Sequence, residues 1–373
     1  MRIAHLTCVY PPYGGGIGEV ARQYAALASI KHQVTVITPR YRPAMTFTAT
    51  PGVNLEVRRP WLALGKAARL AGLIKRLADF EVVHLHYPFY GVHESLAKLP
   101  RAVKLVVTFH MVATASGLKQ KLFELDSRLF DKRLAARAQV LTCATRDYLV
   151  AVAQPRFGEQ AKWQVVPFGV DDRFTPGDIP ERLERGFRLR YGEQVVLFVG
   201  TLDQAHAFKG VEVLLQAVKR LTVPNWRLVI VGGGGLRKHF ERLARTLGLK
   251  KQVEFVGYVP ERELPDYFRL AQVFAFPSVN SAEAFGLVAL QAMASGKPVV
   301  ASRLPGVREL VREGETGLLV PPGDPLALAA ALETLLTRPS EAAKLGQQGR
   351  AVVEQEYRWD VVGRKLLALY ASL

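Results

Sequence analysis

The chain has 373 residues, of which 49% are hydrophobic and 22% charged, and its formal net charge is +17. This length exceeds what one hydrophobic core comfortably supports and predicts two domains. No apolar run reaches the roughly 18 residues that cross a bilayer, and the N-terminus has the pattern of a strand, not of a signal peptide. Cys8 and Cys143 lie in apolar, strand-like contexts, which predicts buried thiols without a disulfide. These features exclude membrane-spanning and disulfide-stabilised secreted proteins and predict a cytoplasmic enzyme.

The positive charge is distributed unevenly. Residues 1–172 carry 23 Lys and Arg against 12 Asp and Glu, whereas residues 173–373 carry 27 against 21. A basic N-terminal half favours an anionic partner, such as a phosphorylated substrate, an acidic lipid surface or nucleic acid. Solubilising charge without a partner is the alternative. No recognised nucleic-acid motif occurs and the basic residues are spread over many elements, so we do not predict nucleic-acid binding.

The first half of the chain alternates strand-like and helix-like segments. Strands are predicted at residues 2–7, 33–38, 82–85, 104–109, 140–143 and 164–167. Helical patterns lie between them at residues 18–29, 65–77, 119–137 and 146–153. Alternating strands and helices predict an α/β fold with a doubly wound parallel sheet.

Residues 169–178 interrupt this alternation with proline, glycine and acidic residues, as in a linker. The pattern then restarts. Strands are predicted at residues 194–200, 226–231, 253–256, 273–276, 298–302 and 317–320, and helices at residues 211–221, 236–247, 263–270 and 362–373. Two α/β domains are therefore predicted, one on each side of the linker. Ligands of open parallel sheets bind beyond the carboxyl ends of the strands, so two facing sheets would form an interdomain cleft.

A carboxylate, Glu283, lies in the short polar turn between the buried strand at residues 273–276 and a helix that ends near residue 295. A helix N-terminus offers free backbone N–H groups and the positive end of a dipole. This combination suits a ligand with a phosphate at one end and hydroxyls at the other. A nucleotide-diphosphate sugar is such a ligand.

Three glycine-containing segments also follow predicted strands. The first, Tyr13-Gly14-Gly15-Gly16-Ile17-Gly18-Glu19, joins the first strand to the first helix, where glycines allow the backbone to approach a ligand closely. Its spacing matches neither the dinucleotide-binding fingerprint nor the P-loop, and a flexible turn is the alternative. The second segment, Gly232–Gly235, predicts a close-approach turn near a nucleotide, and a long connection between a strand and a helix is the alternative. The third, Gly257-Tyr258-Val259, offers backbone N–H and C=O groups that can contact the edge of a base.

Two further side chains are candidates for substrate contact. His110 follows the strand at residues 104–109, and Lys209 precedes a helix, where its charge can neutralise a diphosphate. Considered alone, a structural histidine and a surface lysine are the favoured alternatives. His84 and His86 are close in sequence but lack a third ligand at metal-binding spacing, so we predict no zinc site.

Together these segments resemble the retaining glycosyltransferases of family 4, also called group 1, which have the GT-B fold. The resemblance spans almost the whole chain, and its most specific part is residues 195–325. The motifs there are, in order, Phe-Val-Gly…Phe-Lys-Gly, Val-Gly-Gly-Gly, Val-x-Phe-x-Gly-Tyr-Val, Pro-Ser…Glu-Ala-Phe-Gly-Leu, Ala-Ser-Gly-Lys-Pro-Val-Val-Ala-Ser and Gly-x-Leu-Val-Pro-Pro-Gly-Asp.

The resemblance implies two facing Rossmann-like domains. Residues 1–172 would form an acceptor-binding domain and residues 173–355 a nucleotide-sugar-binding domain, and residues 356–373 would form a helix that crosses back to the first domain. The catalytic residues implied are His110 near the reacting carbon of the sugar, Glu283 at the sugar hydroxyls and Lys209 at the diphosphate. The substrate-binding residues implied are Gly15, Gly16, Thr201, Gly257, Tyr258, Val259, Ala284, Phe285, Gly286, Leu287 and Gln291.

Two positions depart from the family pattern. Gln291 stands where the family usually has a second glutamate, and an amide bonds ribose hydroxyls without charge assistance. Thr201 stands where an arginine often follows the first glycine of the Val-Gly segment, which removes one phosphate partner. His206 or Arg237 is a candidate replacement.

The resemblance implies transfer with retention of anomeric configuration, in which the leaving phosphate helps to take the acceptor proton. No carboxylate pair of the glycosidase kind is visible. The sequence contains no Asp-x-Asp motif, so we predict a metal-independent enzyme without a cofactor, in which Lys209 and helix N-termini stabilise the leaving diphosphate.

Basic and apolar residues interleave at residues 58–77, with Trp61 among them, and residues 119–137 are also basic. This pattern is typical of a membrane-surface helix and predicts peripheral contact with anionic lipid and a lipid-linked or cell-envelope glycan acceptor. An amphipathic helix packed on the sheet is the alternative. Rival functions on the same fold are a nucleotide-sugar epimerase and a non-catalytic nucleotide-sugar-binding protein. The epimerase would need extra acid and base residues near the sugar, and the sequence shows none.

Overall fold

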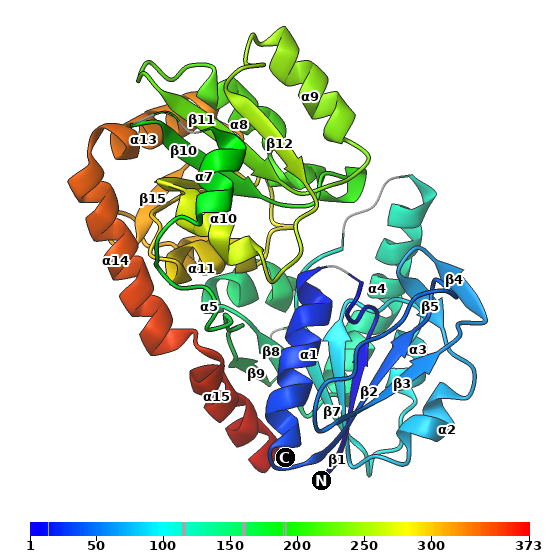
Figure 1. The fold of residues 1–373 in the computed structure, drawn as a ribbon. Helices are drawn as coiled ribbons and strands as arrows, with labels where there is room; N and C mark the ends of the chain where they lie inside the picture. Colours follow the sequence, from blue (N-terminus) through cyan, green and yellow to red (C-terminus); the bar gives the residue numbers. More distant parts are fainter. Residues whose placement is uncertain (14, 114–116, 159–161, 189, 191) are drawn as a thin grey trace. The chain divides into compact units, whose positions relative to one another are not determined.

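A computed structural model describes residues 1–13, 15–113, 117–158, 162–188, 190 and 192–373. The chain forms two compact units (Figure 1). Unit 1 contains Met1–Gly169 together with Trp359–Leu373, and unit 2 contains Val170–Arg358. The chain thus leaves unit 1 after residue 169 and returns to it at residue 359, whereas the sequence placed the boundaries after residues 172 and 355.

Unit 1 is built on a seven-stranded sheet whose strands are all parallel, in the order β3-β2-β1-β6-β7-β8-β9. The strands are β1 (Arg2–Thr7), β2 (Gln33–Pro39), β3 (Val53–Arg58), β6 (Val82–Tyr87), β7 (Lys104–Phe109), β8 (Val140–Cys143) and β9 (Trp163–Val165). The larger helices of this unit are α1 (Gly16–Ser29), α4 (Leu118–Arg137) and α15 (Trp359–Ala371), and the shorter ones are α3 (His93–Ala97), α5 (Arg146–Tyr148) and α6 (Gln154–Phe157) with the π-helical turn Leu149–Ala153 between them. The central strands are buried on both faces, which is why their sequences are continuous apolar runs.

The helix predicted at residues 65–77 is wrong over its first half. The structure has an antiparallel hairpin of β4 (Leu62–Leu64) and β5 (Ala67–Arg69), followed by the short helix α2 (Leu73–Leu77). Gly65 has a φ of 66° and Gly72 a φ of 64°, values in the left-handed region that end regular helix. The spacing of basic and apolar residues resembles helical periodicity, but these two glycines decide the backbone.

The C-terminal helix α15 belongs to unit 1 and packs against α1 (Figure 1). Gly363 in α15 faces Leu27 in α1 so closely that a Cβ there would lie 2.9 Å from the leucine Cδ2 atom. Val362, Leu366 and Leu369 bury the apolar face of α15. A helix at residues 362–373 was predicted from sequence, and the structure extends it by one turn at its start.

Unit 2 is built on a six-stranded parallel sheet in the order β12-β11-β10-β13-β14-β15. The strands are β10 (Gln194–Val199), β11 (Trp226–Val231), β12 (Val253–Gly257), β13 (Val273–Phe276), β14 (Val299–Ser302) and β15 (Gly317–Val320). The helices are α7 (Glu181–Phe187), η2 (Gln204–Lys209), α8 (Val211–Val218), α9 (Arg237–Thr246), α10 (Leu264–Leu270), α11 (Leu287–Ala294), α12 (Val307–Leu310), α13 (Pro325–Thr337) and α14 (Pro339–Glu356). The predicted doubly wound parallel sheets are confirmed in both units.

Strand order reverses direction once in each sheet. In unit 2 the first strand of the sheet, β10, lies between β11 and β13, so the chain winds outward in both directions from the β10–β13 pair. Doubly wound sheets bind ligands at the carboxyl ends of the strands beside such a reversal. The loop after β10 carries Lys209, and the loop after β13 carries Glu283.

Candidate active site

Lys209 and Glu283 form an ion pair at the strand-order reversal of unit 2. The Lys209 Nζ atom lies 2.9 Å from Glu283 Oε2, and the two side chains are 15% and 12% exposed. Ser278 donates its hydroxyl to the same carboxylate oxygen across 3.1 Å. The ion pair thus joins two residues 74 positions apart in sequence. Both side chains remain partly exposed, so a ligand can replace the contact between them.

The two loops that carry this pair are joined through their backbones. The N–H of Val279 donates to the carbonyl of Phe208 across 2.7 Å. Gly210 has a φ of 73°, and a Cβ at this position would overlap the carbonyl oxygen of Pro277. The ammonium of Lys209 also lies 5.5 and 5.7 Å from the ring centroids of Phe208 and Phe276. Glycine at 210 therefore permits the loop contact that fixes Lys209 beside Glu283.

The residues that follow Glu283 lead into the N-terminus of α11. Ala284 and Phe285 are buried, and Gly286 precedes the helix with a φ of 92°. The N-cap residue Gly286 has no side chain that could cap α11, and the first N–H groups of a helix, here from Leu287 onward, have no intrahelical acceptors. These groups, with the positive dipole end, favour an anion at this position.

Gln291 lies in the second turn of α11. Its Oε1 atom is buried and has no hydrogen-bond partner among the described residues. Buried acceptors without a partner are uncommon and destabilising. The ribose contact of residue 291 stays a prediction.

The loops after β10, β11 and β12 approach one another through glycines. The N–H of Gly232 donates to the carbonyl of Gly257, and the N–H of Leu202 donates to the carbonyl of Gly233, each across 2.8 Å. A Cβ at Gly232 would overlap the carbonyl oxygen of Gly200. The glycine runs that the sequence analysis singled out therefore bring three strand ends together.

Thr201 and Tyr258 are exposed members of these loops, and Tyr258 has 82% of its surface accessible. Val259 is half-buried. An exposed aromatic side chain beside a glycine turn can stack on a planar ligand. The structure thus groups the predicted residues 201 and 257–259 at one edge of the unit 2 sheet.

The two candidate replacements for the missing phosphate partner are both engaged. Arg237 donates from Nε to Glu241 across 2.7 Å and from Nη2 to the carbonyl of Phe255 across 2.7 Å. The His206 ring lies 2.6 Å from a carboxylate oxygen of Asp203. Both side chains are therefore held by partners within unit 2.

The glycine loop of unit 1 joins β1 to α1, as predicted; Gly14 lies outside the described residues. Gly15 has a φ of 126°, and Gly16 begins the helix without a side-chain cap. A Cβ at Gly15 would have open space within 4 Å, whereas a Cβ at Gly18 would lie 3.1 Å from the carbonyl oxygen of Val9. Gly18 therefore serves helix packing, and Gly15 leaves an open approach to the helix N-terminus.

His110 follows β7 and is 5% exposed. Its ring stacks on Phe168 with centroids 4.9 Å apart, and its Nε2 atom lies 2.9 Å from His86 Nδ1. Burial lowers the pKa of His110 to about 3, so the ring is neutral near pH 7. A neutral ring acts on a substrate as a hydrogen-bond partner, and its bonded neighbour decides which nitrogen carries the proton.

His84 and His86 have no third ligand at metal-binding spacing in the sequence. The structure supplies a third histidine, because His5 on β1 lies beside both of them and one nitrogen of each falls within 4.8 Å of the others. His5 pairs in register with His84 across the β1–β6 ladder. Nothing in the sequence signalled this contact, because the two strands are 79 residues apart.

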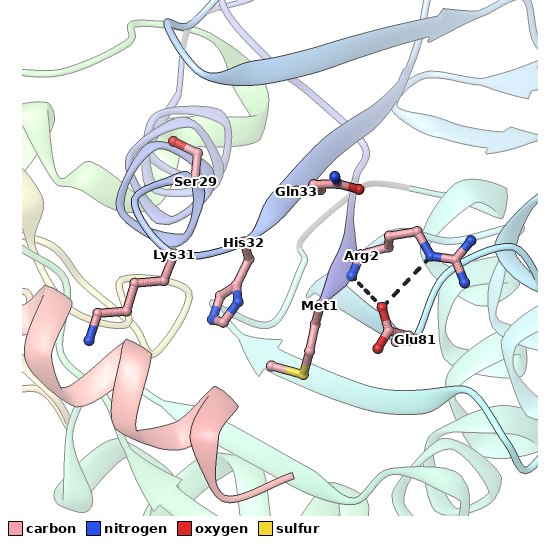
Figure 2. Close-up of a pocket in the computed structure, with 7 residues that line it drawn as sticks. All are labelled: Met1, Arg2, Ser29, Lys31, His32, Gln33 and Glu81. Atoms are coloured by element: carbon pink, nitrogen blue, oxygen red, sulfur yellow. Dashed lines mark hydrogen bonds and ion pairs between the residues drawn. The ribbon is translucent and has the colours of Figure 1, made fainter.

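A pocket in unit 1 lies at the amino ends of β1 and β2 (Figure 2). It is lined by Met1, Arg2, Ser29, Lys31, His32, Gln33 and Glu81. The backbone N–H of Arg2 donates to Glu81 across 2.7 Å at its edge. Parallel sheets bind ligands at the carboxyl ends of strands, so this pocket is on the opposite edge of the sheet from His110 and Gly15. None of the predicted site residues lines it.

Two family models match the chain. The one described as Glycosyl transferases group 1 matches residues 181–352, and the one described as Glycosyl transferase 4-like domain matches residues 14–169. The GDP-mannose-dependent alpha-(1-6)-phosphatidylinositol monomannoside mannosyltransferase of Mycolicibacterium smegmatis is 32% identical over 378 residues, which cover 97% of this chain and 96% of that protein. The chain belongs to the group 1 glycosyltransferases.

Other relatives agree with this assignment. The D-inositol 3-phosphate glycosyltransferase of Corynebacterium urealyticum is 33% identical over 341 residues, covering 86% of this chain and 78% of that protein. The solved structure of sucrose-phosphate synthase from Thermosynechococcus elongatus superposes with a TM-score of 0.82 at 25% identity and covers 100% of this chain and 98% of that chain. This group 1 glycosyltransferase is therefore a retaining enzyme that uses a nucleotide sugar, and its predicted GT-B fold class is confirmed.

Proposed function

We propose that this glycosyltransferase transfers a sugar from a nucleotide-diphosphate sugar to a hydroxyl of a lipid-linked acceptor. The observation that carries the donor half of the proposal is the Lys209–Glu283 pair at the strand-order reversal of unit 2, next to the uncapped N-terminus of α11. The ammonium and the helix N–H groups suit the diphosphate, and the carboxylate suits sugar hydroxyls. The role proposed for His110 is contact with the transferred sugar.

The chemical task of this arrangement is to stabilise the leaving diphosphate. Lys209 and the N–H groups after Gly286 are fixed before the donor binds, so they need little reorganisation as negative charge develops. The diphosphate of the bound donor would replace Glu283 as the partner of the Lys209 ammonium, which now bonds Glu283 and lies near two aromatic rings. The acceptor hydroxyl would lose its proton to the departing phosphate, with no carboxylate pair required.

Replacing Lys209 with alanine is expected to raise the Kd for UDP or GDP about 10- to 100-fold, the effect of one charge-assisted contact. Isothermal titration calorimetry measures this change directly. Lys219→Ala is the matched control, because Lys219 is exposed at the far end of α8. Unchanged nucleotide affinity in the Lys209 variant would contradict the proposed phosphate role.

The acceptor half of the proposal rests on the surface of α4. Four leucines with exposed fractions of 44% or more repeat at helical spacing on one side of this helix, namely Leu118, Leu122, Leu125 and Leu129. Exposed basic residues flank the stripe, namely Lys119, Lys121, Arg128, Lys132 and Arg133. The opposite side of the helix is buried through Ser127, Asp131 and Leu134. An exposed apolar stripe between cationic flanks suits the surface of an anionic membrane.

The β4–β5 hairpin adds exposed Trp61 and Leu62 to unit 1. It is linked to α4 through Tyr90, whose carbonyl accepts from the N–H of Ala68 in β5 and whose ring stacks on Phe123 of α4 at 4.3 Å. The same segment, residues 58–77, is therefore still proposed to contact a membrane, but it does so through a hairpin where the sequence predicted a helix. None of the helices in the described part of the chain has both the length and the apolar character that crossing a bilayer requires.

The double substitution Leu122→Glu and Leu125→Glu is expected to reduce binding to vesicles that contain anionic phospholipid at least about tenfold, because it removes apolar contact and adds repelling charge. Liposome flotation at moderate salt is the measurement. Leu326→Glu is the control, since Leu326 is 65% exposed on α13 of unit 2. Failure of the unaltered protein to float with anionic vesicles would exclude the membrane surface.

An assay of sugar transfer with pairs of candidate donors and acceptors identifies both substrates. The relatives named above act on phosphatidylinositol monomannoside and inositol phosphate, so GDP-mannose and UDP-glucose are tested with phosphatidylinositol, its mannosides and inositol 3-phosphate. Formation of an α-linked product supports the proposal. Nucleotide binding without transfer to any acceptor would favour a nucleotide-sugar-binding protein, and interconversion of free nucleotide sugars would favour an epimerase.

A further inference from the structure

One face of the unit 1 sheet carries a buried polar cluster in an otherwise apolar core. Its members come from four adjacent strands, from the residue that follows β7, and from the C-terminal helix. They are His5, His84, His86, Thr108, His110, Thr142 and Tyr370. All are between 0% and 5% exposed. Buried polar groups of this kind are retained only when they satisfy one another.

The first branch of the cluster runs from the C-terminal helix to the candidate site residue. The Tyr370 hydroxyl lies 3.1 Å from His5 Nε2, and His5 Nδ1 lies 3.0 Å from His86 Nε2. His86 Nδ1 then lies 2.9 Å from His110 Nε2. Tyr370 is thereby connected to His110 through two intervening rings.

The second branch runs from the same hydroxyl in the other direction. Tyr370 lies 2.6 Å from His84 Nδ1, and His84 Nε2 lies 2.6 Å from Thr108 Oγ1. Thr108 in turn lies 2.8 Å from Thr142 Oγ1. Tyr370 is therefore the junction of both branches.

Every ring nitrogen of His5, His84 and His86 has a hydrogen-bond partner in these branches. A metal ion would have to displace such bonds, because it needs the nitrogen lone pair. The three histidines that lie within metal-binding distance of one another thus serve as links of a hydrogen-bonded chain.

The four histidine rings of the two hydrogen-bonded branches are neutral near pH 7. Burial lowers the pKa of His5 and of His110 to about 3, and it lowers the pKa values of His84 and His86 well below their usual range. A neutral imidazole has one N–H donor and one bare acceptor nitrogen. A ring that accepts a hydrogen bond at one nitrogen therefore donates a hydrogen bond from its other nitrogen, so successive bonds along the branch point the same way.

Because each neutral ring has one donor and one acceptor nitrogen, the hydrogen bonds of the two branches have two possible arrangements. If the Tyr370 hydroxyl donates to His5, each ring donates onward and His110 carries its proton on Nδ1. If the hydroxyl donates to His84 instead, each bond reverses and His110 carries its proton on Nε2. A hydroxyl has one proton, so its orientation determines the direction of both branches together.

We propose that Tyr370 is a positioning residue for His110: its hydroxyl, acting through His5 and His86, fixes the tautomer and orientation in which His110 meets the transferred sugar. This inference rests on the proposed function of His110. It also gives the C-terminal helix a role in the reaction besides packing on α1. A fixed tautomer matters because a ring that presents the wrong nitrogen donates where it should accept.

The test compares Tyr370→Phe with Leu366→Ala. The first substitution removes one oxygen and separates the two branches, whereas the second opens a cavity in the same helix, where Leu366 is fully buried, and leaves the chain intact. The expected result is a fall in kcat of about 10- to 100-fold for Tyr370→Phe with donor KM within twofold. Leu366→Ala should keep kcat while its melting temperature falls. Equal kcat for both variants and the unaltered enzyme would overturn the proposal.

A spectroscopic measurement separates positioning from stability. In protein labelled with 15N-histidine, His110 should show one protonated and one bare nitrogen, and Tyr370→Phe should convert these signals to a mixture of tautomers. Unchanged His110 signals in that variant would overturn the proposal. A stoichiometric transition metal in the purified enzyme, found by elemental analysis, would also overturn it, because the metal would occupy the linking nitrogens.

His110→Ala distinguishes failure of the inference from failure of the proposed function. If this variant retains full kcat, His110 does not contact the reacting sugar and the proposed role of His110 is wrong. If His110→Ala loses activity while Tyr370→Phe keeps it, the role of His110 stands and the inference about Tyr370 is wrong.

Discussion

Replacing Glu283 with glutamine is expected to lower turnover by about 100- to 1,000-fold, the usual effect of removing one group that acts on the reacting part of a substrate. Glutamine keeps the shape of the side chain and its hydrogen bond from Ser278 but loses the charge that strengthens bonds to sugar hydroxyls and orients Lys209. Steady-state kinetics with the identified donor measures the change. Nucleotide affinity should alter far less, because Lys209 remains.

The matched control for this substitution is Glu193→Gln. Glu193 also forms a shielded ion pair in unit 2, with Arg227 at 3.1 Å and side-chain exposures of 8% for the glutamate and 16% for the arginine. Its loss should cost stability without lowering kcat. A Glu283 variant with the same turnover as the Glu193 variant would remove the carboxylate from the proposed mechanism.

Unit 1 is expected to lose stability steeply as the pH falls from 7.5 to 5. The pKa of His5 and of His110 is about 3 in the folded protein, against about 6.5 in the unfolded chain. Between these values the unfolded state binds protons that the folded state does not, so the free energy of unfolding decreases as pH falls. Each of the two histidines should cost about 1.4 kcal/mol per pH unit, or about 2 kcal/mol at pH 5.

Other buried groups modify this slope. His84 and His86 act in the same direction, because burial lowers their pKa values as well. Asp131 acts in the opposite direction, because burial raises its pKa and its folded form holds a proton more readily. The loss expected from these buried histidines is a large share of a domain's stability.

The measurement is guanidinium unfolding at each pH, followed by pulse-labelling hydrogen exchange at one fixed pH. Peptides from β1, β6 and β7 report on unit 1 separately from unit 2, which avoids treating two units as one transition. His110→Gln should flatten the slope by about 1.4 kcal/mol per pH unit. His239→Gln should leave the slope of unit 1 unchanged, since His239 is exposed and belongs to unit 2. Constant stability of unit 1 between pH 7.5 and 5 would contradict the prediction.

Most strands of both sheets could be predicted from the sequence, because buried parallel strands are short, continuous apolar runs. The segment at Val273–Phe276 and its polar turn are an example, and the structure has β13 and the Glu283 loop there. The edge strand β3 was missed, because it is only half-buried and its sequence is less apolar. Helix α13 was also missed, although Asp324 caps it and Pro325 begins it, which are recognisable start signals.

The hairpin at residues 62–69 shows where periodicity misleads. Leu62, Ala63, Ala67, Ala68 and Leu70 occur at spacings that fit a helix as well as a hairpin, and the exposed leucines gave no sign of which element they belong to. Gly65 and the pairing of Ala68 with Tyr90 through the backbone decide the outcome. A contact between segments more than 20 residues apart does not appear in a local window of sequence.

By itself the sequence determined the family, the two parallel-sheet domains and the residue types at the strand ends, because the motifs and apolar runs that carry them are local. Tertiary structure alone decided the partners: Lys209 with Glu283, and Tyr370 with His5 and His84. These contacts depend on which strands become neighbours, and strand order follows from the packing of the whole sheet. The histidines that looked like isolated residues in sequence become parts of one hydrogen-bonded network with Tyr370 and Thr108, because polar groups buried away from water must bond one another.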